Sequence, residues 1–284
     1  MKTRKITGIF TAERDDIVDL ITRRALPVTG IDNLNPFIFL NHHGPQNYEE
    51  NNRGLPFGPH PHRGFETVTF ILEGDIAHRD STGTESIIMA GGVQWMTAGR
   101  GLIHSEVSSE HFKRAGGPLE ILQLWVNLPA RLKMSEPYYL GLQKHNIRMY
   151  ERDSGRVKIQ LVSGMWEDNF GPFPTIHPVT TILVHLNDGA EYSFAIPDKE
   201  RIFFYVISGE VTVNETSAKA FSTVAIDDEG EIMDVSSIGG AKILLCHAPP
   251  LNEPVVSYGP FVMNTVEEIN QAIRDFSRNS IGQQ

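Results

Sequence analysis

Short apolar runs broken by Gly, Pro, Asn and Asp dominate the chain, and long helical periodicity is scarce. The runs are rich in β-branched and aromatic residues, which is typical of strands. The pattern therefore predicts an all-β protein of the barrel or sandwich type. The clearest predicted strands cover residues 68–73, 87–89, 121–127, 158–163, 181–186, 202–207, 211–214 and 242–247.

One segment near the C-terminus has the periodicity of an amphipathic helix. Val266, Ile269, Ile273 and Phe276 follow one another at spacings of three, four and three. Thr265, with a glutamate three residues later, forms a capping box. These features predict a helix over about residues 266–277 whose apolar stripe packs on a barrel wall.

The two halves of the chain resemble each other. Residues 70–75 and 205–210 each read as an apolar strand, then a glycine turn (Gly74 and Gly209), then an acidic residue. We therefore expect two tandem β-barrels, over residues 1–134 and 135–284, with the boundary near residues 132–137.

Two pairs of metal-capable side chains stand out in the first half. His60 and His62 precede one predicted strand, and His104 and Glu106 follow a glycine turn about forty residues later. On a strand, residues i and i+2 point to the same face. Two facing strands would bring three imidazoles and one carboxylate around one point, as in a metal site. A polar loop is the alternative interpretation of His60 and His62 alone.

This donor set defines the expected chemistry. Nitrogen and oxygen donors without a thiolate suit Fe(II), Mn, Co, Ni, Cu or Zn and disfavour a calcium or magnesium cage. Four protein ligands leave two positions open on a six-coordinate ion, enough for a bidentate anion or for substrate and dioxygen. A closed tetrahedral zinc site of structural type is the alternative.

Composition narrows the functional classes. The formal net charge of −10 disfavours direct nucleic-acid binding. Cys246 is the single cysteine, so no intramolecular disulfide can form, and its apolar surroundings predict a buried thiol. We find neither a signal-peptide core nor a membrane-spanning stretch, and we expect a cytoplasmic monomer, with the nucleus as a second location in a eukaryote.

The motifs resemble those of the pirin family of the cupin superfamily. The glycine-to-glutamate spacing around His60 and His62 fits the first cupin signature, with Gly74 one residue late. The pirin-like strings are residues 60–67 (HPHRGFET), 94–106 (QWMTAGRGLIHSE) and 258–264 (YGPFVMN).

The resemblance implies more than the residue pattern does. It implies two cupin-type barrels with a metal in the first one only, most commonly Fe(II). It implies that Glu106, not Glu66, is the acidic ligand. It also implies quercetin 2,3-dioxygenase activity, in which a flavonol and dioxygen react and carbon monoxide leaves, and here Glu106 could act as a general base. The alternative function is a metal-dependent or redox-sensing regulator that binds a transcription factor or metabolic enzyme.

The other candidate side chains are interpreted as structural. His42, His43 and His78 are expected at the surface, whereas Trp95 and Met96 either line a substrate pocket or pack in the barrel. In the second half, His177 is expected in a loop, and His185 and His247 are expected to end strands as hydrogen-bonded core or rim residues.

Overall fold

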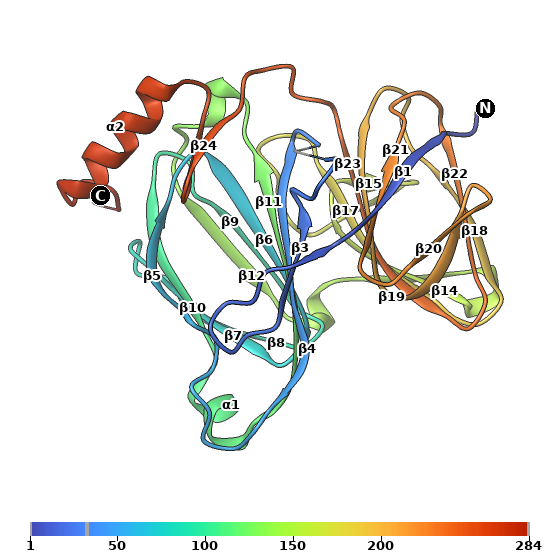
Figure 1. The fold of residues 1–284 in the computed structure, drawn as a ribbon, viewed down its shortest axis with the longest axis horizontal. Coiled ribbons are helices and arrows are strands. Elements are labelled where there is room, and N and C mark those ends of the chain that lie inside the picture. The colour runs from blue at the N-terminus through green and yellow to red at the C-terminus, as the bar shows by residue number, and fades with distance from the viewer. Residues whose placement is uncertain (1, 32–33, 283–284) are drawn as a thin grey trace. The chain divides into compact units, whose positions relative to one another are not determined.

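The computed structural model describes residues 2–31 and 34–282. Strands dominate it and pair mostly in antiparallel fashion, and the described residues include two α-helices, α1 (Glu110–Ala115) and α2 (Val266–Ser277) (Figure 1). The predicted all-β class with a short C-terminal helix is therefore confirmed. No helix in the described part of the chain combines the length and apolar character needed to cross a membrane.

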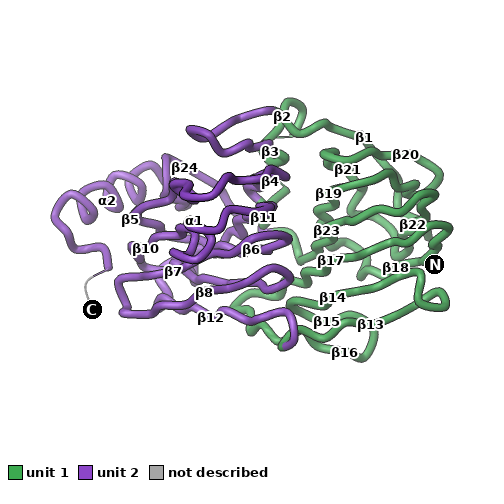
Figure 2. Tube along the Cα trace, turned by 90° about the horizontal axis from the view of Figure 1, so that it is seen from below, with its two compact units in different colours: residues 1–13, 24–37, 146–250 green, residues 14–23, 38–145, 251–284 purple. Residues whose placement is uncertain are grey.

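The chain forms two compact units from interleaved segments (Figure 2). Unit 1 consists of residues 1–13, 24–37 and 146–250, and unit 2 of residues 14–23, 38–145 and 251–284. The C-terminal segment thus belongs to the unit that contains His60. The division of the polypeptide at residue 134 into two consecutive domains remains a prediction.

Unit 2 contains most of two β-sheets. The four-stranded sheet has the order β5 (Phe57–His62), β10 (Leu102–Val107), β7 (Asp75–Asp80) and β8 (Glu85–Met89). The seven-stranded sheet has the order β12 (Tyr138–Leu142), β9 (Val93–Thr97), β6 (Phe65–Glu73), β11 (Gly117–Asn127), β4 (Phe37–Tyr48), β3 (Thr22–Leu26) and β2 (Glu13–Arg14).

The strands of unit 1 form a second, larger sheet system. Its main path is β1 (Ile6–Thr11), β21 (Ser222–Ile226), β19 (Arg201–Val213), β23 (Ala241–Ala248), β17 (Thr180–Leu186), β14 (Val157–Ser163) and β13 (Met149–Arg152). The strands that pair beside this path are β18 (Ala190–Ala195), β20 (Thr216–Lys219) and β22 (Ile232–Ser237). Two hairpins complete the strands: β15 (Met165–Trp166) with β16 (Asn169–Phe170) in unit 1, and β24 (Val256–Tyr258) with β25 (Phe261–Met263) in unit 2.

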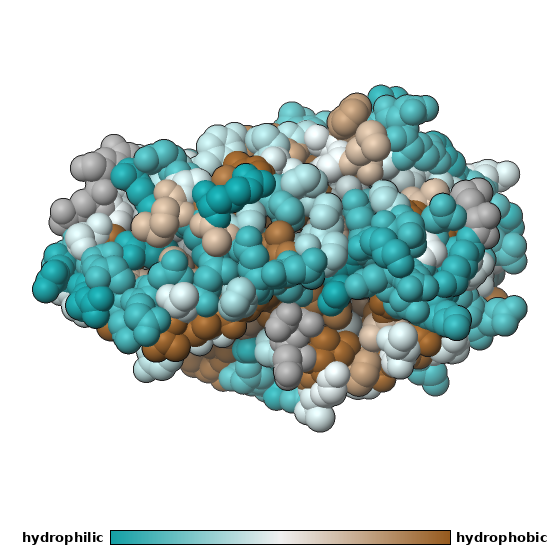
Figure 3. All heavy atoms as spheres, turned by 90° about the horizontal axis from the view of Figure 1, so that it is seen from above, coloured by the Kyte–Doolittle hydropathy of each residue, from teal (hydrophilic) through white to brown (hydrophobic). Residues whose placement is uncertain are grey.

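Alternate residues of the unit 1 strands make its core. Ile202, Phe204 and Val206 of β19 pack with Ile243 and Leu245 of β23 in one apolar cluster. Because successive strand residues face opposite sides, these i, i+2 positions define the inner face of the barrel. Hydrophilic side chains cover most of the molecular face seen in Figure 3, as expected of a strongly acidic chain.

Both glycines that suggested a duplication lie where the chain turns a corner between sets of strands. Gly74 separates β6 of the seven-stranded sheet from β7 of the four-stranded sheet. The prediction that Gly209 ends a strand was wrong, since β19 runs through it and changes partners from β21 to β20. Gly209 has a φ of 78°, a left-handed conformation that glycine adopts without strain, and this permits the corner without ending the strand.

The C-terminal helix has the predicted bounds and cap. The hydroxyl of Thr265 accepts a hydrogen bond from the Glu268 amide at 3.2 Å, and the Glu268 carboxylate accepts one from the Thr265 amide at 2.9 Å. Ile269 and Ala272 pack against β25 in unit 2. The prediction that the whole apolar stripe is packed was wrong, because Val266 and Phe276, at the two ends of the helix, are 57% and 41% exposed.

Candidate metal centre

The backbone pairing of β5 and β10 places the predicted histidines opposite one another. His104 is the direct antiparallel partner of His60, and Leu102 is the partner of His62. Leu102, His104 and Glu106 are all buried while the residues between them are half-buried, so this face of β10 points inward. The strand alternation expected from the sequence is therefore the feature that brings the histidines together.

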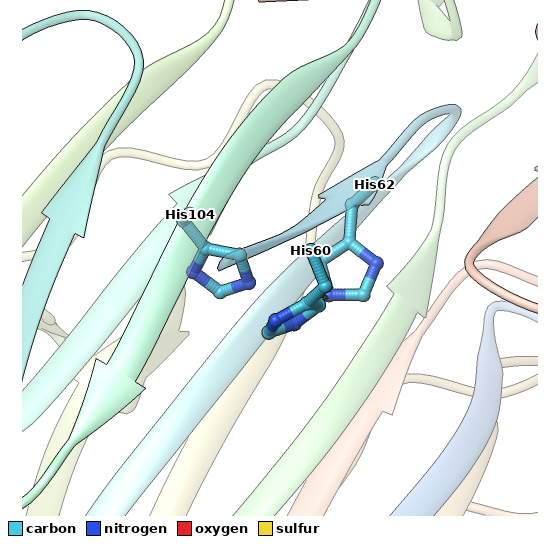
Figure 4. A group of neighbouring side chains, drawn as sticks. All are labelled: His60, His62 and His104. Atoms are coloured by element: carbon cyan, nitrogen blue, oxygen red, sulfur yellow. Dashed lines mark hydrogen bonds between the residues drawn. The ribbon is translucent and has the colours of Figure 1, made fainter. Parts of the chain in front are cut away.

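The three imidazoles lie close enough to share one ion. Their candidate ligand nitrogens all lie within 4.8 Å of one another. The Nε2 atoms of His60 and His62 are 3.1 Å apart, and the ring centroid of His104 is 4.4 Å from that of His60 and 5.0 Å from that of His62. Figure 4 shows the rings of His60 and His62 beside that of His104, which comes from the neighbouring strand.

Backbone carbonyls orient two of the rings. His60 Nδ1 lies 2.8 Å from the Gly58 oxygen, and His62 Nδ1 lies 3.4 Å from the Pro260 oxygen. A carbonyl can only accept, so each Nδ1 carries the proton and each Nε2 presents a lone pair. This is the tautomer that a metal-binding imidazole needs when its other nitrogen is held by the protein.

Burial keeps the cluster neutral. It lowers the pKa of His60, lowers that of His62 to about 3, and lowers that of His104 well below its ordinary value. Both ring nitrogens of His104 are buried without a hydrogen-bond partner in the described part of the chain. Buried polar groups normally find partners, so a ligand-accepting imidazole accounts for this one. The three histidines thus fit a divalent transition metal with nitrogen ligands.

Glu106 lies on the same face of β10 but outside the three-histidine group. Its carboxylate accepts hydrogen bonds from Gln123 Nε2 at 2.6 Å, from Thr69 Oγ1 at 3.2 Å and from Gln94 Nε2. Burial raises its pKa to about 7, although these three donors act in the opposite direction. The role of Glu106 as a fourth ligand remains a prediction.

The partners of Glu106 form a row across three strands. Gln94 of β9 and Gln123 of β11 both pair with Thr69 of β6. Tyr139 extends the row, because its hydroxyl donates to Gln94 Oε1 at 3.0 Å. The sequence alone assigned no role to Gln94, and Thr69, Gln123 and Tyr139 were missed. Polar residues inside otherwise apolar strands were the available signal.

Three histidines expected at the surface are buried, and that prediction was wrong. His42 and His43 lie inside the long strand β4, where His42 Nε2 is 3.0 Å from Glu120 Oε1 and His43 Nδ1 is 2.9 Å from Thr22 Oγ1. His78, opposite Glu106 in the β7–β10 pairing, stacks on Tyr139 with ring centroids 3.9 Å apart. Paired acceptors or aromatic neighbours offset the cost of burying these rings.

The remaining candidates of the first half lie in the interior. Glu66 pairs with Thr97 of β9, whose Oγ1 donates to the Glu66 carboxylate at 2.5 Å, and Glu66 lies on the side of β6 opposite Thr69. Trp95 and Met96 are each 1% exposed, so both pack in the interior.

The chain matches known proteins along most of its length. Residues 19–126 match the pirin family, and residues 181–282 match the pirin C-terminal cupin domain. A Pseudomonas aeruginosa protein named "Putative quercetin 2,3-dioxygenase" is 35% identical over 276 residues, with 96% of each chain covered. Human pirin is 35% identical over 283 residues, covering 96% of this chain and 92% of pirin.

A solved structure agrees with these sequence matches. The crystal structure of quercetin 2,3-dioxygenase from Acinetobacter baumannii superimposes with a TM-score of 0.94 and 32% identity over 99% of both chains. The predicted architecture of two cupin-type barrels is therefore confirmed. The family match and the fold lead to one conclusion: this chain is a member of the pirin family of the cupin superfamily.

Proposed function

We propose that the protein is a metal-dependent dioxygenase acting on quercetin or a similar planar enolic molecule. The proposal is carried by the convergence of His60, His62 and His104, with a buried and unsatisfied imidazole among them. The reaction class is supported by the names of the relatives from Pseudomonas aeruginosa and Acinetobacter baumannii.

His60, His62 and His104 would hold one divalent transition metal, with Glu106 as the fourth donor and Fe(II) as the expected ion. When bound, such an ion supplies a Lewis acid that polarises and orients a substrate anion. The protein contributes neutral, oriented imidazoles, because burial lowers the pKa of all three histidines.

Glu106 would move the proton that the reaction requires. A flavonol must lose its enolic proton to become the reactive anion, and a carboxylate within reach can accept it. Burial raises the pKa of the metal-free Glu106 carboxyl to about 7, and a bound cation would oppose this rise and keep the carboxylate ready to accept a proton. Gln123 and Gln94 would hold the carboxylate in place through their side-chain amides.

An aromatic wall beside His62 supports a planar substrate. The ring of Trp125 lies 5.2 Å from that of His62 and stacks on Phe39 at 4.4 Å with an interplanar angle of 22°. Phe65 lies 5.0 Å from His62 and 4.3 Å from Trp125, and it is fully buried, so it supports this wall from within. Flat aromatic surfaces bind planar rings by stacking, which favours a flavonol over an aliphatic enol.

Oxygen consumption tests the proposal. Iron-loaded wild-type protein should consume dioxygen with quercetin, whereas His60→Ala should lose this activity while its circular dichroism stays native. His145→Ala is the matched control, because His145 is exposed and lies outside the cluster. Turnover that survives His60→Ala would remove the cluster from the chemistry. An iron-loaded wild type that consumes no oxygen with any flavonol would favour the regulatory function instead.

A further inference from the structure

We propose that unit 1 carries a second small-molecule site, which binds a planar aromatic compound through a phenolic hydroxyl. The site is a pocket of about 670 Å³, within the size range of ligand pockets. All its lining residues fall within residues 164–249, so it belongs to unit 1, whereas the three histidines belong to unit 2. The inference therefore does not rest on the dioxygenase proposal.

The pocket lies at one end of the unit 1 barrel, where its apolar core stops. Ile243 and Leu245 of β23 belong to that core, and His247 is the next residue on the same side of the strand. Thr180, the first residue of β17, pairs directly with His247. Both residues line the pocket, so its floor is the polar end of an otherwise apolar barrel.

His247 is held in one tautomer. Its Nδ1 is 2.5 Å from the carboxylate of Glu200, which also lines the pocket. A carboxylate accepts and does not donate, so Nδ1 carries a proton, and the ring in its neutral form offers Nε2 as an acceptor. A hydrogen-bond donor is the matching ligand group, and a phenolic hydroxyl supplies one on an aromatic ring.

A buried arginine fixes the loop that carries Glu200. Arg4 is 1% exposed, and its guanidinium donates to the backbone oxygens of Glu200 at 2.9 Å, Asp227 at 2.8 Å and Pro197 at 2.6 Å. Pro197 is itself part of the pocket lining. The His247–Glu200 pair is therefore held in place before any ligand binds, which reduces the entropy lost on binding.

The walls of the pocket are apolar and open to solvent. Met165, Phe170 and Ile176 line it and are 55%, 74% and 41% exposed. Phe173 also belongs to the lining and is buried. Exposed apolar side chains gathered at one opening mark a binding site more often than scattered ones do. Together with the His247–Glu200 pair, they favour a flat apolar molecule that bears one hydrogen-bond donor.

Calorimetric titration of the full-length protein with 2-naphthol and with naphthalene tests the inference. Wild-type protein should bind 2-naphthol about fivefold more tightly, the effect of one neutral hydrogen bond. His247→Phe should remove this difference while leaving naphthalene affinity unchanged. Ile176→Glu should weaken both ligands at least about tenfold by placing a charge at the apolar opening.

Two controls locate the binding. Ile238→Glu alters a side chain that is 91% exposed and outside the pocket, and it should change neither affinity. His60→Ala should also leave both affinities unchanged, which separates this site from the metal cluster. The inference is overturned if wild-type protein binds neither compound, if the hydroxyl preference persists in His247→Phe, or if Ile176→Glu binds like the wild type.

Discussion

The way in which His104 is buried lowers the stability of the folded protein. Its ring is 1% exposed, and neither nitrogen has a hydrogen-bond partner among the described residues. Such burial typically costs about 1–3 kcal/mol for each unsatisfied polar group. A side chain retained at this cost is expected to serve a ligand, and stability and function then oppose each other at one position.

The stability cost of His104 can be measured by comparing His104→Phe with the wild type in metal-free protein. Because the substitution removes buried groups that lack partners, we expect the free energy of unfolding to rise by about 1 kcal/mol or stay unchanged. Chemical denaturation in the presence of a chelator gives the value. A loss above about 2 kcal/mol would show that the imidazole has a structural role in the absence of metal.

Glu66 should give the protein a pH-dependent weakness. Burial raises its pKa from 4.5 to about 7, so its ionisation destabilises the folded state as the pH rises through that interval. The penalty is complete above pH 7 and amounts to about 3 kcal/mol. Glu66→Gln should therefore unfold at higher denaturant concentration than the wild type near pH 8, and the gap should close near pH 4.5. A gap that does not vary with pH would contradict this assignment.

The cluster was predictable from the sequence because strand alternation is local. His60 and His62 share a face for any extended backbone, as do His104 and Glu106. The supports of Glu106 were not predictable, because Thr69, Gln94 and Gln123 meet only through the pairing of three strands. That pairing is a tertiary property.

The corner at Gly209 allows β19 to pair with one set of strands before this residue and with another set after it. A Cβ atom there would lie 2.1 Å from the Gly240 backbone oxygen, and φ is 78°. The sequence signalled a special backbone at this position but not whether the strand ends. Glycine occurs both at bulges within a strand and at the ends of strands, and only the pairing with partner strands distinguishes the two cases.

Gly209→Ala should therefore destabilise the protein by about 3 kcal/mol or more, through left-handed strain and a clash with backbone. Gly239→Ala is the matched control, because Gly239 has a φ of 87° and open space where a Cβ atom would lie. We expect about 1 kcal/mol from strain alone in the control. Equal losses in urea denaturation would show that the close approach to Gly240 has no energetic weight.

At the scale of the whole molecule, the two units differ in chemistry although both are barrels. The predicted ligands lie in unit 2, and the C-terminal segment of residues 251–284 belongs to the same unit. The sequence predicted two barrels because each half repeats a strand and corner glycine. The expected second domain, residues 135–284, included the last helix, although the apolar stripe of that helix fits either barrel wall.

Metal binding should stabilise unit 2 selectively. A ligand that binds only the folded state adds about 2.7 kcal/mol at a concentration one hundred times its dissociation constant. Hydrogen exchange with and without nickel should thus show slower exchange in residues 38–145 and little change in residues 157–248. Equal protection of both segments would indicate that the metal acts on the whole molecule, and protection confined to residues 157–248 would place the ion in the wrong unit.

The most direct test of the three-histidine centre is metal stoichiometry. Chelated and reloaded wild-type protein should retain one divalent transition-metal ion per chain after gel filtration, measured by elemental analysis. His60→Ala and His104→Ala should each retain almost none, whereas His145→Ala should behave like the wild type. A folded His104→Ala protein that still holds one ion per chain with unchanged affinity would contradict the account.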